Sequence, residues 1–239
     1  MRPGASAIVA RVGSARAAVA ELIATFALVF IGAGASITSG FGLDLTGVAL
    51  AHGLVLAGMI AATAHLGGGL VNPAVSIGLW VAGTFTTTRA LALVVAEILG
   101  AVAAAFLLRY LVPDTAYTSA SGGTPVISSA LPAGKGVVIE AACTFLLVFA
   151  VFALVADGRR PLLGTGAAFA IGSVYAVCIM VFGPFTGAAM NPARWLGPAL
   201  ASGGWADWYV WIVGPVSGAI IASVLYSALF LRGRSPGTP

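Results

Sequence analysis

Two short stretches of the chain place small and polar residues inside long apolar runs. One extends from Gly67 to Val75 and the other from Thr186 to Arg194. The first contains Asn72, Pro73 and Ala74, and the second contains Asn191, Pro192 and Ala193. Asn is favoured at the residue that caps a helix N-terminus, and Pro is favoured at the first helical position. Each Asn-Pro-Ala tripeptide therefore predicts the start of a helix.

Two helix starts that meet would form the centre of a narrow lumen. Each start carries a partial positive charge, and an Asn that spends its carbonyl on capping keeps its NH2 group as a donor. The residues just before each Asn, Gly67 to Val71 and Gly187 to Met190, cannot be helical throughout, so their carbonyls need water or protein partners. Such a lumen suits small neutral molecules. It repels cations, and the donors of Asn72 and Asn191 interrupt the oriented water chain that a proton needs.

The composition places the chain in a membrane. Of its 239 residues, 60% are hydrophobic and only 8% are charged, whereas a soluble domain carries about a quarter charged residues. The length allows about six crossings of ~20 residues each. This composition leads us to expect a lipid bilayer around the protein. The net charge of +4 comes from scattered residues, so we expect no nucleic-acid partner.

Six apolar runs are long enough to cross a bilayer, and two further runs are not. The predicted crossings are about Ala17–Thr38, Thr46–His65, Arg89–Val112, Val137–Ala156, Leu162–Phe182 and Trp208–Leu231. Pro73–Ala82 and Pro192–Ala201 have only about ten residues each and predict re-entrant half-helices. Pro113–Gly136 predicts an external connection, and Asp157–Pro161 predicts a charged turn. The sequence thus predicts an all-α integral membrane protein with a single domain over residues 1–239.

The two halves of the chain repeat each other. Glu21 and Glu140 are each followed, at the same spacing, by Thr-Phe and Leu-Val-Phe, and each half has three crossings with a half-helix after the second. Because three is odd, the halves, about 17–112 and 137–231, enter the membrane from opposite sides, which makes an inverted repeat. Most arginines then fall on one side, with Arg109 and Lys135 near the other. The positive-inside rule predicts that residues 1–16 and 232–239 are cytoplasmic tails.

With these motifs the chain resembles the aquaporins of the major intrinsic protein family over about Ala17 to Leu231. The resemblance is carried by His65–Gly68 before the first Asn-Pro-Ala, by Thr186–Gly187 before the second, and by the glutamate that opens each half. It implies six helices and two half-helices around a pore, a homotetramer with one pore per subunit, and passive transport of water or small neutral solutes. We expect no enzymatic activity, cofactor or metal ion, and we expect a plasma or inner membrane as the location.

The resemblance also implies a four-residue selectivity filter on the outer side of the Asn pair. Matching positions gives His52, Ile179, Ala188 and Arg194. Water-selective members typically carry Phe and His where this chain has His52 and Ile179. A His-Ile-Ala-Arg filter is similar to that of some plant tonoplast members, which admit ammonia, urea or glycerol as well as water. We therefore expect a water channel with a wider, more apolar filter; the alternative is a channel mainly for glycerol or ammonia with low water permeability.

Further residues are expected to support the two broken stretches. Glu21 and Glu140 are predicted to accept hydrogen bonds from loop N–H groups, and His65 is predicted to brace the first loop. Glu97 is predicted to be a hydrogen-bonding strut rather than a gating residue. The positions expected to supply pore carbonyls or support are Gly67, Gly68, Gly69, Gly187 and Ala189.

Other readings of the sequence are weaker. An ammonia-selective channel would pair histidines along its lumen, but His65 belongs to the loop motif and leaves His52 alone. An intramembrane hydrolase would use Ser173 as a nucleophile, yet no histidine lies C-terminal to it. A structural junction protein of the same fold would need a blocked pore. For Arg194, an ion pair with Asp207 is the structural alternative to a role in the pore.

Overall fold

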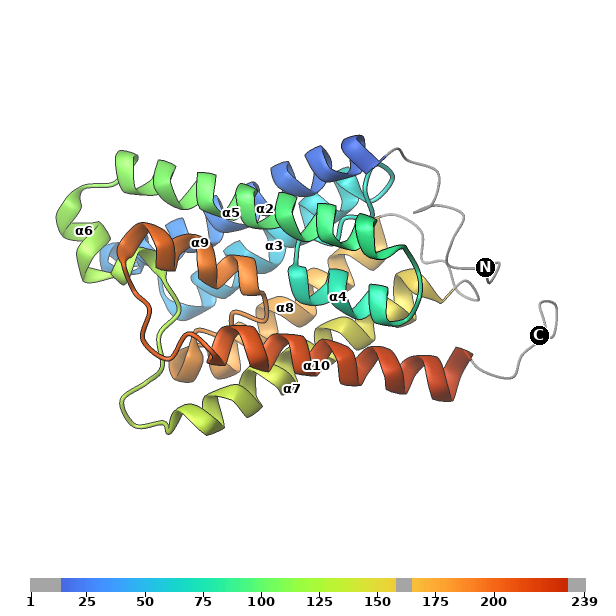
Figure 1. The fold of residues 1–239 in the computed structure, drawn as a ribbon. Coiled ribbons are helices and arrows are strands. Elements are labelled where there is room, and N and C mark those ends of the chain that lie inside the picture. Colours follow the sequence, from blue (N-terminus) through green and yellow to red (C-terminus); the bar gives the residue numbers. More distant parts are fainter. Residues whose placement is uncertain (1–13, 158–164, 232–239) are drawn as a thin grey trace.

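The computed structural model describes residues 14–157 and 165–231, which form a bundle of helices (Figure 1). The long helices are α2 (Ser14–Thr38), α3 (Leu45–Thr63), α5 (Thr87–Leu111), α7 (Ala133–Val151), α8 (Thr165–Thr186) and α10 (Val210–Tyr226). The π-helical turns η3 (Phe152–Ala156) and η4 (Ser227–Leu231) extend α7 and α10. All six spans are long and apolar enough to cross a membrane. The predicted all-α membrane fold is confirmed.

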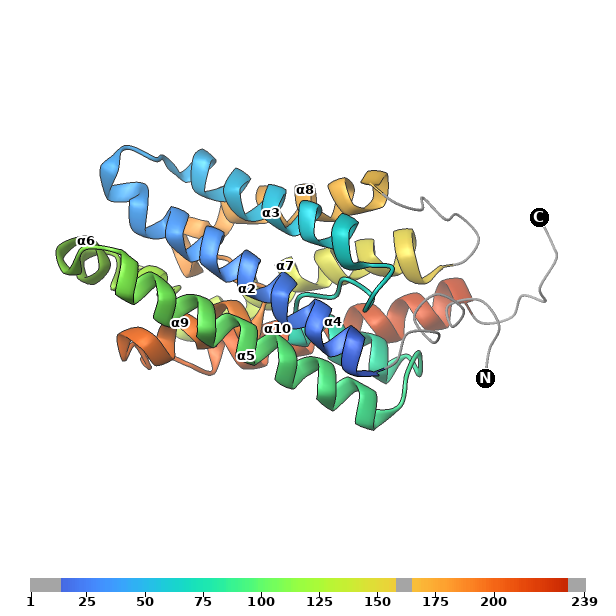
Figure 2. The same cartoon turned by 90° about the horizontal axis from the view of Figure 1, so that it is seen from above.

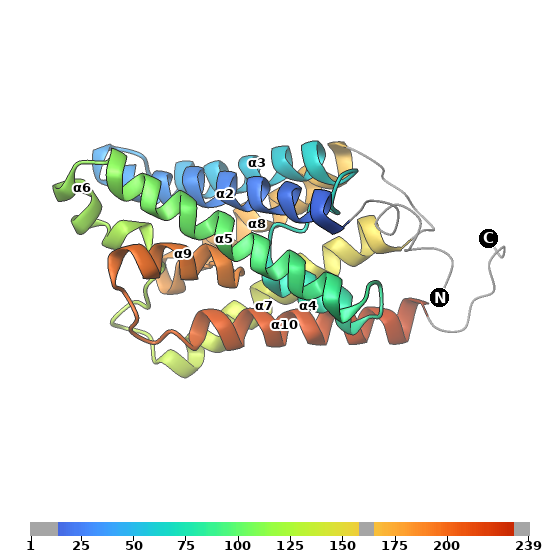
Figure 3. The same cartoon turned by 45° about the horizontal axis from the view of Figure 1, so that its top comes forward.

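Two short helices, α4 (Pro73–Val81) and α9 (Pro192–Ser202), start inside the bundle. Figure 3 shows that the two short helices lie in opposite halves of the length of the bundle. Their ends agree with the predicted half-helices within one residue, because Asn and Pro mark each start so clearly. Leu162, where the fifth crossing was predicted to begin, lies outside the described residues, as does most of the predicted charged turn at 157–161.

The long helices pack in pairs that reflect the repeat. The most extensive contacts join α2 to α5 in the first half and α7 to α10 in the second, while α3 and α8 join the two halves (Figure 2). At the α3–α8 crossing, a Cβ atom on Gly53 would lie 2.5 Å from the carbonyl oxygen of Gly172. Only glycine allows the two backbones to approach this closely, as small residues do in other membrane bundles.

The half-helices exchange partners between the halves. α4 of the first half packs extensively on α10 of the second, and α9 of the second half packs on α5 of the first. Glu21 and Glu140 are 119 residues apart in the sequence, and so are Asn72 and Asn191. Residues separated by 119 positions are therefore equivalent in the two repeats, and the equivalence extends to the contacts at the centre of the bundle.

The connection between the halves contains a short helix that the sequence did not indicate. α6 (Asp114–Ser119) and the 3-10 turn η2 (Ser121–Gly123) lie within Pro113–Gly136, at the opposite end of the bundle from the start of α2 (Figure 1). Tyr117 of α6 is buried, and Arg109 at the end of α5 lies over its ring at 5.9 Å. α6 also packs on α2, which is distant in the sequence, and such a contact leaves no local pattern in a polar segment.

Candidate functional site

Asn72 and Asn191 cap the two half-helices at the centre of the bundle. The side-chain oxygen of Asn72 accepts from the backbone N–H of Ala74 at 2.9 Å. The oxygen of Asn191 accepts from Ala193 at 3.0 Å and from Arg194 at 3.2 Å. Both asparagines are buried, so the capping bonds replace the water that these backbone groups have lost.

The amide groups of the same asparagines reach across to the other repeat. Asn72 Nδ2 donates to the carbonyl of Met190 at 2.8 Å, and Asn191 Nδ2 donates to the carbonyl of Val71 at 2.8 Å. An NH2 group has two hydrogens, so each asparagine keeps one for another acceptor. The two halves are thus joined at their centre by a reciprocal pair of hydrogen bonds.

Glu21 and Glu140 hold the loops that precede the asparagines. Glu21 accepts from the N–H groups of Leu70 at 3.0 Å and Val71 at 2.7 Å. Glu140 accepts from the equivalent residues, Ala189 at 2.9 Å and Met190 at 2.7 Å. Both glutamates are completely buried. Each carboxylate therefore satisfies two backbone donors that no helix or sheet could satisfy.

These contacts maintain an unusual backbone conformation. Val71 and Met190 have φ angles of 58° and 50°, and Ala188 has a φ of 43°. Positive φ is uncommon for residues other than glycine and is a clear outlier for a β-branched residue such as valine. It turns the N–H groups toward the glutamates and leaves the carbonyls of Val71 and Met190 for the asparagines. Strained backbone of this kind is common at functional sites, so the two loops are functional candidates.

Other polar contacts around the loops differ between the repeats. Glu97 accepts from the backbone N–H of Asn72 at 3.2 Å and from the hydroxyl of Ser76 at 2.7 Å, so it acts as a strut. Thr186 donates to Glu140 at 2.8 Å. The side chain of His65 is exposed in the turn after α3, whereas Gly67 to Val71 is buried. The buried support of the first loop comes from Glu21 and Glu97 rather than from His65.

Trp195 holds the second half-helix by aromatic packing. Its ring stacks on Trp211 at 5.5 Å with an interplanar angle of 9°, and Trp205 packs edge-on against it at 5.7 Å. Trp211 Nε1 donates to the carbonyl of Thr186 at 2.9 Å. The position equivalent to Trp195 in the first half is Ser76. An indole stack therefore takes the place of the Ser76–Glu97 hydrogen bond.

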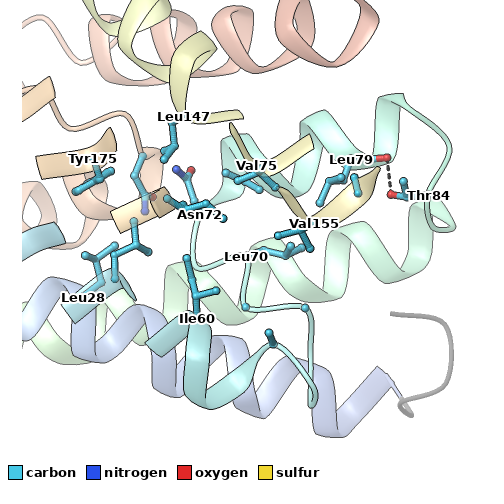
Figure 4. Close-up of a pocket in the computed structure, with 18 of the residues that line it drawn as sticks. Leu28, Ile60, Leu70, Asn72, Val75, Leu79, Thr84, Leu147, Val155 and Tyr175 are labelled. Atoms are coloured by element: carbon cyan, nitrogen blue, oxygen red, sulfur yellow. Dashed lines mark hydrogen bonds between the residues drawn. The ribbon is translucent and has the colours of Figure 1, made fainter. Parts of the chain in front are cut away.

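An apolar cavity extends from the asparagines along α4. In Figure 4, Asn72 and Tyr175 lie toward one end of this inner cavity, and Leu79 and Thr84 lie toward the other. Its walls are mainly aliphatic and come from both repeats. They include Leu28, Leu56, Ile60, Val75, Leu147, Val151, Val155 and Ile171. Water passing here would meet few hydrogen-bonding side chains apart from the asparagines.

A second cavity, which we name the outer cavity because the predicted filter lies there, is more polar. His52, Ile179 and Arg194 line it, so the structure brings together three of the four residues expected in the filter. Ala188 is completely buried and is not among the residues that line either of these two cavities; its neighbour Gly187 lines the outer one.

Arg194 is buried and held from three directions. Nε donates to His52 Nε2 at 3.0 Å, NH1 donates to the carbonyl of Gly123 at 2.9 Å, and NH2 donates to the hydroxyl of Ser36 at 3.4 Å. These neutral acceptors replace the contact with Asp207 that the sequence left open. Gly123 belongs to η2, so the connection between the halves reaches into the outer cavity.

Sequence reasoning did not identify several of these partners. Tyr175 donates its hydroxyl to the carbonyl of Ala189 at 2.7 Å, so this expected pore carbonyl already has one partner. Ser36 and Gly123 looked like ordinary helix and loop residues. The repeat relates Ser36 to Val155, and each of these residues lines one of the two cavities. Ser173, by contrast, donates to the carbonyl of Phe169 within its own helix.

Comparison with known proteins agrees with this architecture. The chain is similar to aquaporin TIP4-4 of Zea mays, with 42% identity over 94% of this chain and 91% of the relative. It is 40% identical to aquaporin TIP2-1 of Arabidopsis thaliana over 95% and 91% of the two chains. The X-ray structure of the aquaglyceroporin from Plasmodium falciparum has the same fold, with a TM-score of 0.80 at 24% identity, covering 91% of this chain and 97% of that one.

The family described as "Major intrinsic protein" matches residues 9–226. The match includes the first repeat, nearly all of the second, both capped half-helices and all of the residues that line the two cavities. This chain belongs to the major intrinsic protein family.

Proposed function

We propose that the protein is a passive membrane channel for water that also admits small neutral solutes such as glycerol, ammonia and urea. The observation that carries the proposal is the pair of asparagine-capped half-helices whose amides meet between an outer and an inner cavity. The remaining amide hydrogens of Asn72 and Asn191 donate to a permeating oxygen atom. A water molecule held in this way directs its own hydrogens away from the centre.

The same centre excludes ions and protons. A cation meets two helix N-termini and the guanidinium of Arg194, all of which are positive. A proton would need waters oriented in one direction along the whole pore. The central donors impose opposite orientations on the two sides, so the chain of waters is interrupted.

The filter is proposed to consist of His52, Ile179, Ala188 and Arg194. Ile179 presents an apolar wall to the outer cavity where a polar side chain would favour water alone. Ala188 is small, so the loop beside Gly187 adds little bulk. Carbon-bearing neutral solutes therefore have an apolar surface to slide along, together with the donors of Arg194.

The test is solute flux in vesicles that contain the purified protein. Stopped-flow light scattering measures osmotic water permeability, and the same vesicles report the uptake of glycerol, urea and ammonia. We expect water permeability well above that of empty vesicles. A value equal to the empty control would refute the channel, whereas strict transport of water alone would refute only the relaxed filter.

We further propose a homotetramer in a plasma or inner membrane, with both termini on the cytoplasmic side. The start of α2 and the end of α10 lie at the same end of the bundle (Figure 1), and the positive-inside rule applied to the sequence predicts that both termini are cytoplasmic. The mass of the protein in detergent, measured by light scattering, tests the tetramer. Protease access to tags added at each terminus, in sealed vesicles of known orientation, tests the topology.

A further inference from the structure

Both ring nitrogens of His52 are already used within the protein. Nδ1 bonds to the carbonyl of Val48 at 2.8 Å, and Nε2 bonds to Arg194 Nε at 3.0 Å. Because an arginine can only donate, Nε2 must accept and Nδ1 must carry the hydrogen. The side chain is only 2% exposed. In this arrangement His52 serves to hold Arg194 and does not offer a nitrogen to the permeating molecule.

Gly32 of α2 provides the space in which the His52 ring lies. A Cβ atom at residue 32 would be 2.5 Å from Cδ2 and 2.5 Å from Nε2 of His52. Nonbonded carbon atoms prefer separations of about 3.5–4.0 Å, so the ring would have to move by about 1 Å. One of the two atoms in closest conflict is Nε2, which is the atom that holds Arg194.

The ring has little freedom to move without losing this bond. Tyr175 packs against it at a centroid distance of 6.2 Å, and the Nδ1 bond to Val48 fixes its other edge. If His52 shifts, Arg194 keeps the carbonyl of Gly123 at 2.9 Å and the longer contact to Ser36. The guanidinium then loses one of its three anchors in the outer cavity.

We infer that Gly32 determines selectivity: the absence of a side chain there lets His52 lie against α2 and so fixes Arg194 at the outer end of the pore. Gly32 is a positioning residue, since it acts through His52. The inference rests on the proposed channel function. It assigns a filter role to a residue on α2, a helix that supplies none of the four residues expected from the sequence.

Gly34 provides a matched control on the same helix. A Cβ atom at Gly34 would be 3.5 Å from Leu108, an ordinary contact distance. Alanine favours helix formation over glycine by about 1 kcal/mol, so neither Gly32→Ala nor Gly34→Ala should weaken α2 by itself. A difference between the two variants therefore reports the space around His52.

The experiment compares water and glycerol permeability of wild type, Gly32→Ala, Gly34→Ala, His52→Ala and the double variant Gly32→Ala/His52→Ala in phospholipid vesicles. We expect Gly32→Ala to change the glycerol-to-water permeability ratio by about threefold or more and Gly34→Ala to leave it within about 1.5-fold. Adding Gly32→Ala to His52→Ala should change nothing further, because the ring that it displaces is gone.

Two results would overturn the inference while leaving the channel intact. One is a conducting wild type with indistinguishable Gly32→Ala and Gly34→Ala variants. The other is a Gly32→Ala effect of equal size with and without His52. If Gly32→Ala yields no folded protein, recovery of folding in the double variant supports the inference, and failure in both backgrounds refutes it. A wild type that does not conduct refutes the proposed function itself.

Discussion

The outer and inner ends of the pore occupy equivalent positions of the repeat but have opposite character. At the outer cavity lie Ser36, His52 and Arg194, and their equivalents 119 residues away, Val155, Ile171 and Val75, all line the inner cavity. Ile179 corresponds to Ile60, so one wall is the same at both ends. The difference shows that one backbone arrangement, used twice, supports polar side chains at one cavity and apolar side chains at the other.

The two repeats share the contacts that support their loops and differ in the side chains that face the cavities. Glu21 and Glu140 make the same bonds to equivalent N–H groups. Gly32, however, corresponds to Val151. The inner end therefore carries a side chain at the position where the outer end leaves space for the His52 ring. The proposed filter therefore predicts that selectivity depends on the outer end.

The largest effect is expected from removing the support that the two ends share. Glu140→Ala and Glu21→Ala each leave two buried N–H groups without an acceptor, at about 1–3 kcal/mol for each group. Both variants should lose most of their folded protein. Glu140→Ala should be worse, because Thr186 also loses its acceptor. Thermal unfolding in detergent measures the stability of each variant. Wild-type stability of either variant would show that the loop keeps its conformation without the glutamate.

A large change in selectivity is expected when Arg194 is replaced by its inner equivalent. Arg194→Val removes the charge that opposes cations at the outer cavity, so glycerol flux should rise about tenfold and a proton leak should appear. A pH-sensitive dye inside the vesicles reports the leak. Val75→Ala, at the equivalent position of α4, is the control and should alter neither quantity by more than about twofold. Equal effects of the two variants would mean that the ends share the selectivity.

A smaller effect is expected for His52→Ile, which copies Ile171. Arg194 loses the acceptor for Nε but keeps Gly123 and Ser36. We expect the glycerol-to-water permeability ratio to rise about threefold without a proton leak. If His52→Ile leaks protons as strongly as Arg194→Val, the histidine contributes to the barrier itself, beyond its hold on the arginine.

The smallest effect is expected for Ser36→Val, which copies Val155. The contact from Arg194 to the Ser36 hydroxyl is 3.4 Å long, near the limit for a hydrogen bond. The permeability ratio should stay within about 1.5-fold of wild type. A change as large as that of His52→Ile would show that Ser36 is a full member of the outer filter.

The sequence by itself determined the features that depend on neighbouring residues. Asn-Pro marked both half-helix starts within one residue, because capping and the fixed φ of proline act locally. The apolar runs gave the six spans, because lipid demands about twenty apolar residues in a row. The matching positions of Glu21 and Glu140 indicated the repeat and the equivalent roles of these two residues. The short helix α6 was not predicted, because it packs on α2, which is distant in the sequence.

Only the tertiary structure decided which atoms meet across the bundle. His52 and Arg194 are 142 residues apart, and the asparagine amides find their acceptors 118 and 120 residues away. His65 proved exposed, which left the buried support of the first loop to the two glutamates that the sequence had indicated, and Trp195 gained a role through its stack on Trp211. The reason is physical: a hydrogen bond or a close contact requires a position and an orientation in space. Neither is contained in the spacing of residues along the chain, and Gly32 is the clearest case, since a missing side chain leaves no mark until its neighbour is seen.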